Sequence, residues 1–294
     1  MSPIIVDTGV QPQLDETHCP LLLGQCLLSL RALIVPDRPK PPPPTWRSGP
    51  QDRHVAADGA AAPSVLARQP LSSCNAHTGT TAWTPPLFDQ PIVMLDFETT
   101  GLSAAGGDRI TEVAALRIVD DVVVDRYVTL INCGVRIPSF VTALTGISQR
   151  MVDGAPPVAQ VLPQLLAFIG NDVLAAHNAR FDNNFLLAES QRQGLTPGHR
   201  GLICSLKLAR RMLPGQRSYK LGGLAHALNI SYRGNAHRAE ADAEVSTRLL
   251  LHIGDSLRQQ FRCQSIAPSL LEAINRQSAA KVPAFLSRSF EVGS

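Results

Sequence analysis

The feature that most constrains this chain is the stretch PIVMLDFETTGL at 91–102, in which an apolar run ends in two acids. The run predicts a buried strand, and successive side chains of a strand point to opposite faces, so Asp96 and Glu98 project from the same side. Two carboxylates this close repel each other unless a divalent cation lies between them, and hard oxygen ligands suit Mg²⁺ or Mn²⁺. A solvated strand end is the alternative interpretation of this pair.

Composition and cysteine spacing argue against several classes of protein. The chain has 294 residues, of which 44% are hydrophobic, so it can bury a substantial core. A net charge of +3 is too small to identify a nucleic-acid-binding protein by itself. The six cysteines form no C-x-x-C pair, which argues against a zinc site and favours reduced thiols in the cytoplasm. The apolar stretch at 20–35 is interrupted by Gln25, Ser29 and Arg31 and is shorter than a membrane span of ~20 residues, so we expect no membrane partner.

Proline placement divides the chain. Residues 1–88 contain a tetraproline at 41–44 and many further prolines, which predict a largely disordered leader with one possible short helix at 21–33. Regular patterns begin at residue 91. They predict three strands joined as an antiparallel meander, at about 92–97, 110–119 and 122–131, with a hairpin turn at Asp120 and Asp121.

Helical periodicity dominates after residue 138, interrupted by short strands at 173–176 and 202–204. Helices are expected at 139–144, 158–169, 180–194, 206–213, 221–228, 239–254 and 268–276. This order predicts an α/β domain at 89–254, with a mixed sheet flanked by helices, and a C-terminal helical tail at 255–294.

Two later segments add polar residues. Asp182 lies in HNARFDNNFL, which leaves the 173–176 strand and enters a helix, where the helix dipole also stabilises a carboxylate. His237 and Asp242 lie in HRAEAD, and their spacing lets a loop histidine and an aspartate one turn into a helix face the same cleft. Each segment alone is also explained as a helix-start acid or as surface residues.

Together the segments resemble a known family. DFETTGL, HNARFD and HRAEAD resemble, in order and separation, the three exonuclease motifs of the DEDDh family, which includes the epsilon proofreading subunit of bacterial DNA polymerase III. TALTGIS at 142–148 and SYKLGGLAHALNI at 218–230 resemble further segments of this family. The resemblance covers about residues 90–254. It implies a ribonuclease H-like fold and hydrolysis of nucleic acid from a 3′ end.

The resemblance also implies a role for each motif residue. Two divalent ions about 4 Å apart, Mg²⁺ or Mn²⁺, would be held with Asp96 between them. Glu98 and Asp242 would complete the site of the attacking water, and Asp182 would help to hold the second ion. His237 would be the general base, because an ordinary pKa of about 6.5 suits proton removal near neutral pH.

Substrate contacts have open alternatives. By the same resemblance the terminal nucleotide would lie against the residues after the first acids, which are Thr99, Thr100, Gly101 and Leu102. The alternative there is a turn plus a core leucine. Asn178 binds substrate or caps the helix after it, and Glu112 faces the cleft or points outward.

The distribution of charge supports a polyanionic partner. No Asp or Glu occurs from Ser190 through Ala239, where nine Lys and Arg residues lie. An acidic pocket cannot attract a polyanion unaided, so a neighbouring basic surface favours binding. We expect a phosphate track that includes Lys207, Arg210, Arg211, Arg217 and Lys220. A scattered solvated face is the alternative.

The resemblance, supported by the acids and the basic segment, implies a metal-dependent 3′–5′ exonuclease that releases nucleoside 5′-monophosphates from single-stranded or frayed DNA 3′ ends. Proofreading as a DNA polymerase subunit, stand-alone repair and RNA trimming remain open. A catalytically silent nucleic-acid-binding module is a further alternative, against which the intact motif residues argue. Only about 40 residues follow Gly254, where the proofreading subunit carries its polymerase-binding tail. The leader is not a family feature and is either an interaction arm or an upstream start-site artefact.

Overall fold

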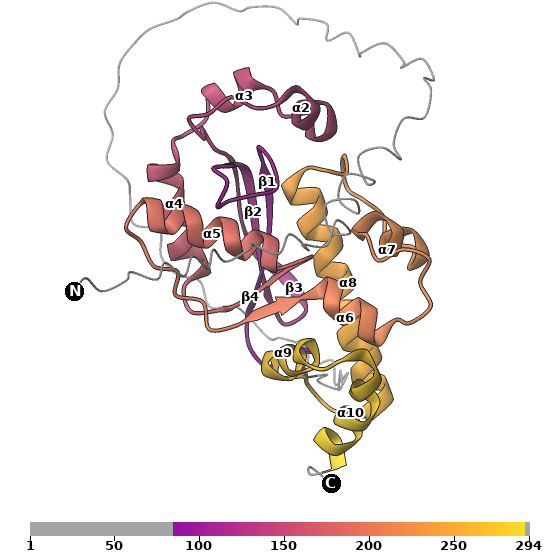
Figure 1. Cartoon of the computed structure of the whole chain (residues 1–294). Helices are drawn as coiled ribbons and strands as arrows, with labels where there is room; N and C mark the ends of the chain where they lie inside the picture. The colour runs from indigo at the N-terminus through magenta and orange to yellow at the C-terminus, as the bar shows by residue number, and fades with distance from the viewer. Residues whose placement is uncertain (1–84, 292–294) are drawn as a thin grey trace, which may run out of the picture. The chain divides into compact units, whose positions relative to one another are not determined.

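The computed structural model describes residues 85–291, drawn as the coloured ribbon in Figure 1. The possible helix at 21–33 and all but the last four residues of the predicted leader lie outside these described residues. Within the last four, Leu87 and Phe88 are buried in the core. The carbonyl of Leu87 accepts a hydrogen bond from the N–H of Ile266 at 2.7 Å. The folded domain therefore includes residues that the sequence assigned to the leader, because their apolar side chains complete the core.

A five-stranded sheet in the order β3-β2-β1-β4-β5 forms the centre of the domain. Its strands are β1 (Ile92–Thr99), β2 (Ile110–Val119), β3 (Val122–Leu130), β4 (Val173–Ala176) and β5 (Leu202–Cys204). The first three pair antiparallel as a meander. Strand β4 pairs with β1 in parallel, and β5 pairs with β4 in parallel. The predicted mixed sheet is thus confirmed.

The turn between β2 and β3 consists of two aspartates. Asp120 and Asp121 have φ angles of 49° and 66°, the left-handed conformation that a two-residue hairpin requires and that Asp adopts more readily than most residues. The Asp121 carboxylate also accepts a hydrogen bond from the N–H of Leu87 at 2.8 Å. The predicted hairpin is confirmed, and its turn also binds the backbone of Leu87.

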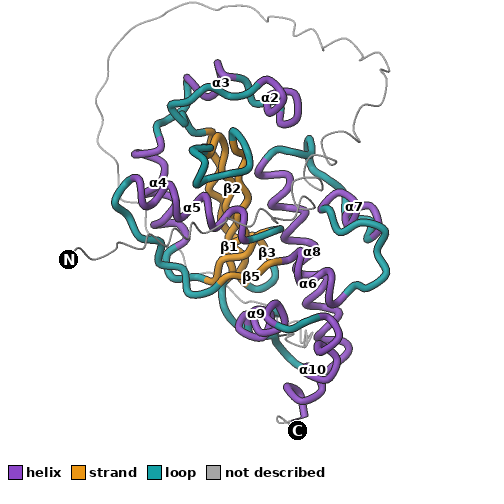
Figure 2. The backbone as a smooth tube through the Cα atoms, in the orientation of Figure 1, coloured by secondary structure: helices purple, strands orange, loops and turns teal. Residues whose placement is uncertain are grey.

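Helices cover both faces of the sheet, as the purple and orange segments in Figure 2 show. They are α2 (Ser139–Thr145), α3 (Gln149–Asp153), α4 (Val158–Ile169), α5 (Arg180–Arg192), α6 (Ser205–Met212), α7 (Leu221–Ala227), α8 (Ala239–Phe261), α9 (Pro268–Arg276) and α10 (Val282–Glu291). None of the helices in the described part of the chain is long and apolar enough to cross a membrane. The short helix α3 was not predicted, and its sequence signal is Ser148, whose side chain accepts a hydrogen bond from the N–H of Met151.

Alternation along β1 builds a core on each face. Ile92 and Met94 belong to one hydrophobic cluster, together with residues of α6, α8 and α9. Val93, Leu95 and Phe97 belong to the other, together with residues of α4 and α5. Because β1 is buried on both sides, its backbone is held firmly where its carboxyl end delivers Asp96 and Glu98.

Helix α8 is longer than predicted and runs through the expected domain boundary at residue 254. Glycine often ends a helix, but a Cβ on Gly254 would lie 2.7 Å from the Cδ2 atom of Leu87. Gly254 therefore permits close packing within the helix, which ends instead at Phe261, followed by the C-cap residue Arg262 with a φ of 52°. Residues beyond 254, among them Leu271 and Leu286, pack into the same cluster as Ile92. The helices of the predicted C-terminal tail therefore pack on the same core as the sheet.

Candidate active site

Four carboxylates meet at the carboxyl end of β1. Phe97 is buried in the core behind the sheet, so its neighbours Asp96 and Glu98 face the other way. The first turn of α8 brings Asp242 to them, and one ligand atom from each of these three acids lies within 4.8 Å of the others. Asp182, in the first turn of α5, is buried, and its Oδ1 accepts a hydrogen bond from the N–H of Phe97 at 3.2 Å. The structure thus places Asp182 directly beside β1.

Burial and mutual repulsion disfavour the ionised form of these acids. The pKa of Asp96 is raised well above its ordinary value by burial, then by the charges of Asp182, Asp242 and Glu98. Burial first, and then the charge of Asp242, raises the pKa of Glu98 to about 8. Burial likewise raises the pKa of Asp182 to about 8. Without a counter-charge, such a site takes up protons near neutral pH.

The residues present fit a divalent cation. Their donors are carboxylate oxygens, the hard ligands that Mg²⁺ and Mn²⁺ prefer. The Oδ1 atom of Asp242 is buried and has no hydrogen-bond partner among residues 85–291. A buried oxygen without a partner is costly, and a cation would satisfy it while neutralising the crowded charges.

His237 lies in the loop that leads into α8. Its backbone N–H donates a hydrogen bond to the Oδ2 atom of Asp242 at 3.2 Å. Its φ of 62° is left-handed, which is uncommon for a residue other than glycine. The charge and N–H of His237 oppose the effect of burial, which raises the pKa of Asp242. The predicted histidine and aspartate are therefore in direct contact through the backbone.

Two residues next to the site had no predicted catalytic role. Glu112 lies directly opposite Glu98 in the β1–β2 register and is buried, and Arg238 pairs with its carboxylate at 2.5 Å. Of the two orientations that the sequence left open, the outward one is wrong, because Glu112 is buried and its charge helps to raise the pKa of Asp96 and of Glu98. Tyr232 is the other residue, and burial and the charge of Asp242 raise its pKa. The register of the predicted meander was the only sequence signal that could have placed Glu112 beside the site.

The loop after β1 holds itself together through the threonines predicted to bind substrate. The Thr99 hydroxyl donates to the carbonyl of Gly101 at 2.6 Å. Thr100 is buried, and its hydroxyl accepts a hydrogen bond from the N–H of Arg109 at 3.0 Å. Leu102 is 55% exposed, so the alternative of a core leucine is wrong. An exposed leucine beside the acids remains available to a substrate.

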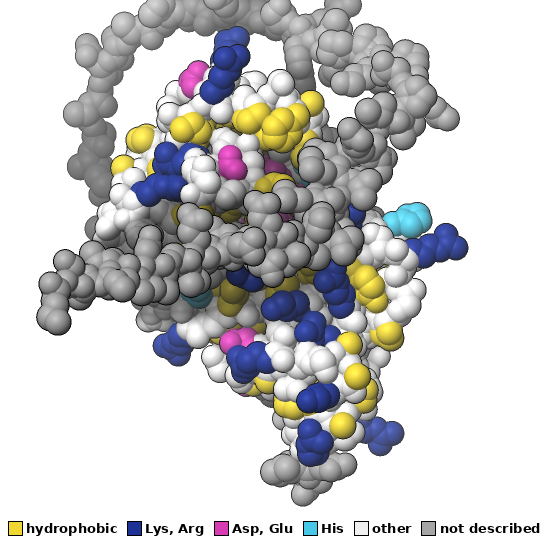
Figure 3. Space-filling view, viewed as in Figure 1, with side chains coloured by type: hydrophobic (Ala, Val, Ile, Leu, Met, Phe, Trp, Pro, Cys, Tyr) yellow, Lys and Arg dark blue, Asp and Glu magenta, His cyan; other side chains and the backbone are white. Residues whose placement is uncertain are grey.

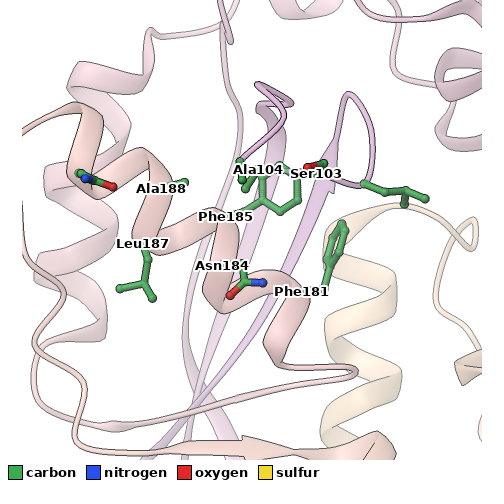
Figure 4. Close-up of a pocket in the computed structure, with 10 residues that line it drawn as sticks. Ser103, Ala104, Phe181, Asn184, Phe185, Leu187 and Ala188 are labelled. Atoms are coloured by element: carbon green, nitrogen blue, oxygen red, sulfur yellow. The ribbon is translucent and has the colours of Figure 1, made fainter. Parts of the chain in front are cut away.

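A pocket of about 470 Å³ lies between this loop and α5. Figure 4 shows Ser103 and Ala104 on the loop side and Phe181, Asn184, Phe185 and Leu187 along the helix. Leu102 also lines it. The rings of Phe181 and Phe185 are 4.9 Å apart between centroids. The wall of the pocket is thus largely apolar and begins one residue from Asp182.

Asn178 does not cap α5 with its side chain. The N-cap of α5 is Ala179, which makes no side-chain cap hydrogen bond. Asn178 instead has a left-handed φ of 68°, and its carbonyl accepts a hydrogen bond from the N–H of Phe181 at 2.8 Å. The capping interpretation is therefore wrong, because the chain turns sharply at Asn178 before the helix begins.

Basic side chains gather on the face that carries α6, α9 and α10 (Figure 3). Arg210 of α6 lies over the ring of Tyr219, 6.0 Å from its centroid. Arg211 differs from its neighbour, because its guanidinium donates to the carbonyl of Gln277 at 2.9 and 2.7 Å. Arg211 thus ties α6 to the end of α9, a structural role that the phosphate-track prediction did not include.

Comparison with known proteins yields relatives with exonuclease and polymerase names. The sequence model of the family described as "Exonuclease" matches residues 93–250. The chain is 39% identical over 196 residues to "DNA polymerase III PolC-type" of Clostridium perfringens, which covers 67% of this chain and 13% of that protein. It is 29% identical over 171 residues to "DNA polymerase III subunit epsilon" of Aquifex aeolicus, covering 58% of this chain and 84% of that protein.

A solved structure supports the fold. E. coli Exonuclease I in complex with a dT13 oligonucleotide has a TM-score of 0.52 and 18% identity, over 59% of this chain and 43% of that one. This likeness concerns the fold alone. The chain spans only a small part of the PolC-type relative's length. The family model, in contrast, matches residues 93–250, which are more than half of this chain. The chain therefore belongs to the exonuclease family.

Proposed function

We propose that this protein is a metal-dependent 3′–5′ exonuclease that hydrolyses DNA from its 3′ end and releases nucleoside 5′-monophosphates. The observation that carries the proposal is the cluster of Asp96, Glu98 and Asp242, with Asp182 beside it and one buried oxygen of Asp242 left without a partner among residues 85–291. So many carboxylates with raised pKa values are unfavourable unless a cation balances them.

The acids and the histidine have different roles in this proposal. Asp96, Glu98, Asp182 and Asp242 would hold two divalent ions, Mg²⁺ or Mn²⁺. When bound, such ions polarise the attacking water and stabilise the leaving 3′ oxygen. His237, in the loop that leads into α8 beside Asp242, takes the proton from the attacking water.

Substrate contacts are proposed on both sides of the acids. Exposed Leu102 and the backbone around Gly101 receive the terminal nucleotide, and Asn178 lies in the turn after β4 on the other side. Lys207, Arg210, Arg217 and Lys220 contact backbone phosphates further along the strand.

DNA is preferred to RNA in this proposal because the relatives carry polymerase III names. A single-stranded or frayed 3′ end is the expected substrate. The names of these relatives also support association with a DNA polymerase. We place the protein in the cytoplasm, consistent with the free thiols of Cys133, Cys204 and Cys263.

The deciding experiment is digestion of 3′-labelled and 5′-labelled single strands of DNA and RNA with Mg²⁺, with Mn²⁺ and with EDTA. Label at the 3′ end should be released first as a mononucleotide, and EDTA should stop the reaction. Asp96→Ala should be inactive, whereas Asp89→Asn, an exposed acid outside the site, should be fully active. Activity that persists in Asp96→Ala would refute the metal assignment, and release from the 5′ end would refute the polarity.

A further inference from the structure

Glu112 and Arg238 form a two-pronged ion pair at the edge of the carboxylate cluster. The Nε atom of Arg238 donates to Oε2 of Glu112 at 3.0 Å, and a terminal nitrogen donates to Oε1 at 2.5 Å. The side chain of Glu112 is 4% exposed and that of Arg238 is 38% exposed. This planar, double contact defines the position of the arginine more closely than a single hydrogen bond would.

The same carboxylate also starts a helix. Oε2 of Glu112 accepts a hydrogen bond from the N–H of Ala239, the first residue of α8, at 3.0 Å. Arg238 is the N-cap of α8 and makes no side-chain cap hydrogen bond of its own. A negative group from β2 therefore satisfies a free N–H at the positive end of α8, where an anion is favourable. Strand β2 thus sets where α8 begins.

The contact of Glu112 with Arg238 and Ala239 lies between His237 and Asp242, the two site residues of this segment. His237 precedes Arg238 and has a left-handed φ of 62°, a conformation that persists only where surrounding contacts enforce it. Asp242 lies one turn into α8 and accepts the N–H of His237. Glu112 is paired in register with Glu98 on β1. One carboxylate therefore links the strand that carries Glu98 to the segment that carries His237 and Asp242.

We infer that Glu112 and Arg238 are a positioning pair that sets His237 and Asp242 against Asp96 and Glu98. This inference rests on the exonuclease function proposed above and assigns the pair no contact with substrate. Arg238 has a second effect, because it neutralises a carboxylate that would otherwise add to the negative charge around Glu98.

General attachment of α8 to the sheet does not depend on this pair. Arg126 of β3 contacts Glu240 and Glu244 of α8 at 2.9 and 2.7 Å. That contact joins the same helix to the same sheet but does not touch residues 237–239. It provides a matched control, since loss of a strand-to-helix ion pair alone should affect stability and not catalysis.

The test compares Glu112→Gln, Arg238→Gln and Arg238→Lys with Arg126→Gln in the full chain. Glu112→Gln and Arg238→Gln should lower kcat roughly 10- to 100-fold with little change in KM, because small displacements of catalytic groups have effects of this size. Arg238→Lys keeps the positive charge but not the double hydrogen bond of the guanidinium, so its kcat should lie between those of Arg238→Gln and the unaltered protein. Arg126→Gln should keep the kcat of the unaltered protein.

A second readout does not depend on activity. Amide hydrogen exchange of residues 236–242 should be faster in Glu112→Gln and Arg238→Gln and unchanged in Arg126→Gln. Unchanged kcat and exchange in Arg238→Gln, or losses equal to those of Arg126→Gln, would overturn the inference, even if Glu112→Gln fails to fold. An inactive unaltered protein would refute the proposed function, and the exchange comparison would still decide the role of this pair.

Discussion

Repulsion among the site carboxylates predicts that the protein without divalent cations becomes less stable as the pH rises. Burial, then the charges of Asp242 and Glu112, raises the pKa of Glu98 from 4.5 to about 8. In the unfolded chain Glu98 loses its proton at the ordinary pKa, whereas in the folded chain it keeps the proton to a higher pH. Stability from this group is complete below pH 4.5 and is lost as the pH rises through about 8.

The size of the effect follows from the shift. One pKa unit corresponds to about 1.4 kcal/mol, so the full shift corresponds to an upper limit of roughly 5 kcal/mol in the free energy of unfolding. Glu98 is partly exposed, and we expect about half of this limit because solvent screens the charge. For a domain of this size that is a change in Tm of roughly 5–10 °C.

The substitution Glu98→Gln keeps the size of the side chain and removes its charge. In EDTA it should raise Tm by this amount at about pH 8.5 and have little effect at about pH 5. With Mn²⁺ the unaltered protein should have the higher Tm, because the variant lacks a metal ligand. Thermal unfolding followed by circular dichroism measures each Tm, and Asp89→Asn, which removes an exposed acid, is the control. A Tm of the unaltered protein that is constant or rises with pH in EDTA would refute the reasoning.

Three further predictions concern the base, the loop after β1 and the basic surface. His237→Ala should lower kcat roughly 10²- to 10⁴-fold while DNA affinity, measured by fluorescence anisotropy, is retained; equal losses would indicate a positional role. Gly101→Ala would place a Cβ 2.4 Å from the Asp108 carboxylate and should destabilise the protein by about 1–3 kcal/mol and raise KM, and an unchanged KM would contradict this. Arg211→Gln should lower Tm and leave DNA affinity nearly unchanged. Arg217→Gln should weaken DNA binding and reduce by about 1 the slope of log affinity against log salt concentration. An unchanged affinity and salt slope in Arg217→Gln would remove Arg217 from the phosphate track.

Local patterns were sufficient for most of the elements. The bounds predicted for the helix at 158–169 and for the strand at 173–176 agree with α4 and β4, because hydrophobic periodicity and turn residues act over a few neighbours. The aspartates at 120 and 121 predicted their hairpin for the same reason. Local signals misled at Gly254 and Asn178, where packing against Leu87 and a turn in the backbone outweighed the usual meanings of these residue types.

The sequence by itself was enough to predict which residues would carry the chemistry and in what order, because side-chain type and alternation along a strand are properties of short segments. Only the tertiary structure decided how the segments meet. It placed Asp182 against the backbone of Phe97 and joined Asp242 to Asp96 and Glu98. The contact of Glu112 with Arg238 spans 126 residues, and such a pairing depends on the register of a sheet and the direction of a helix, which no local pattern encodes.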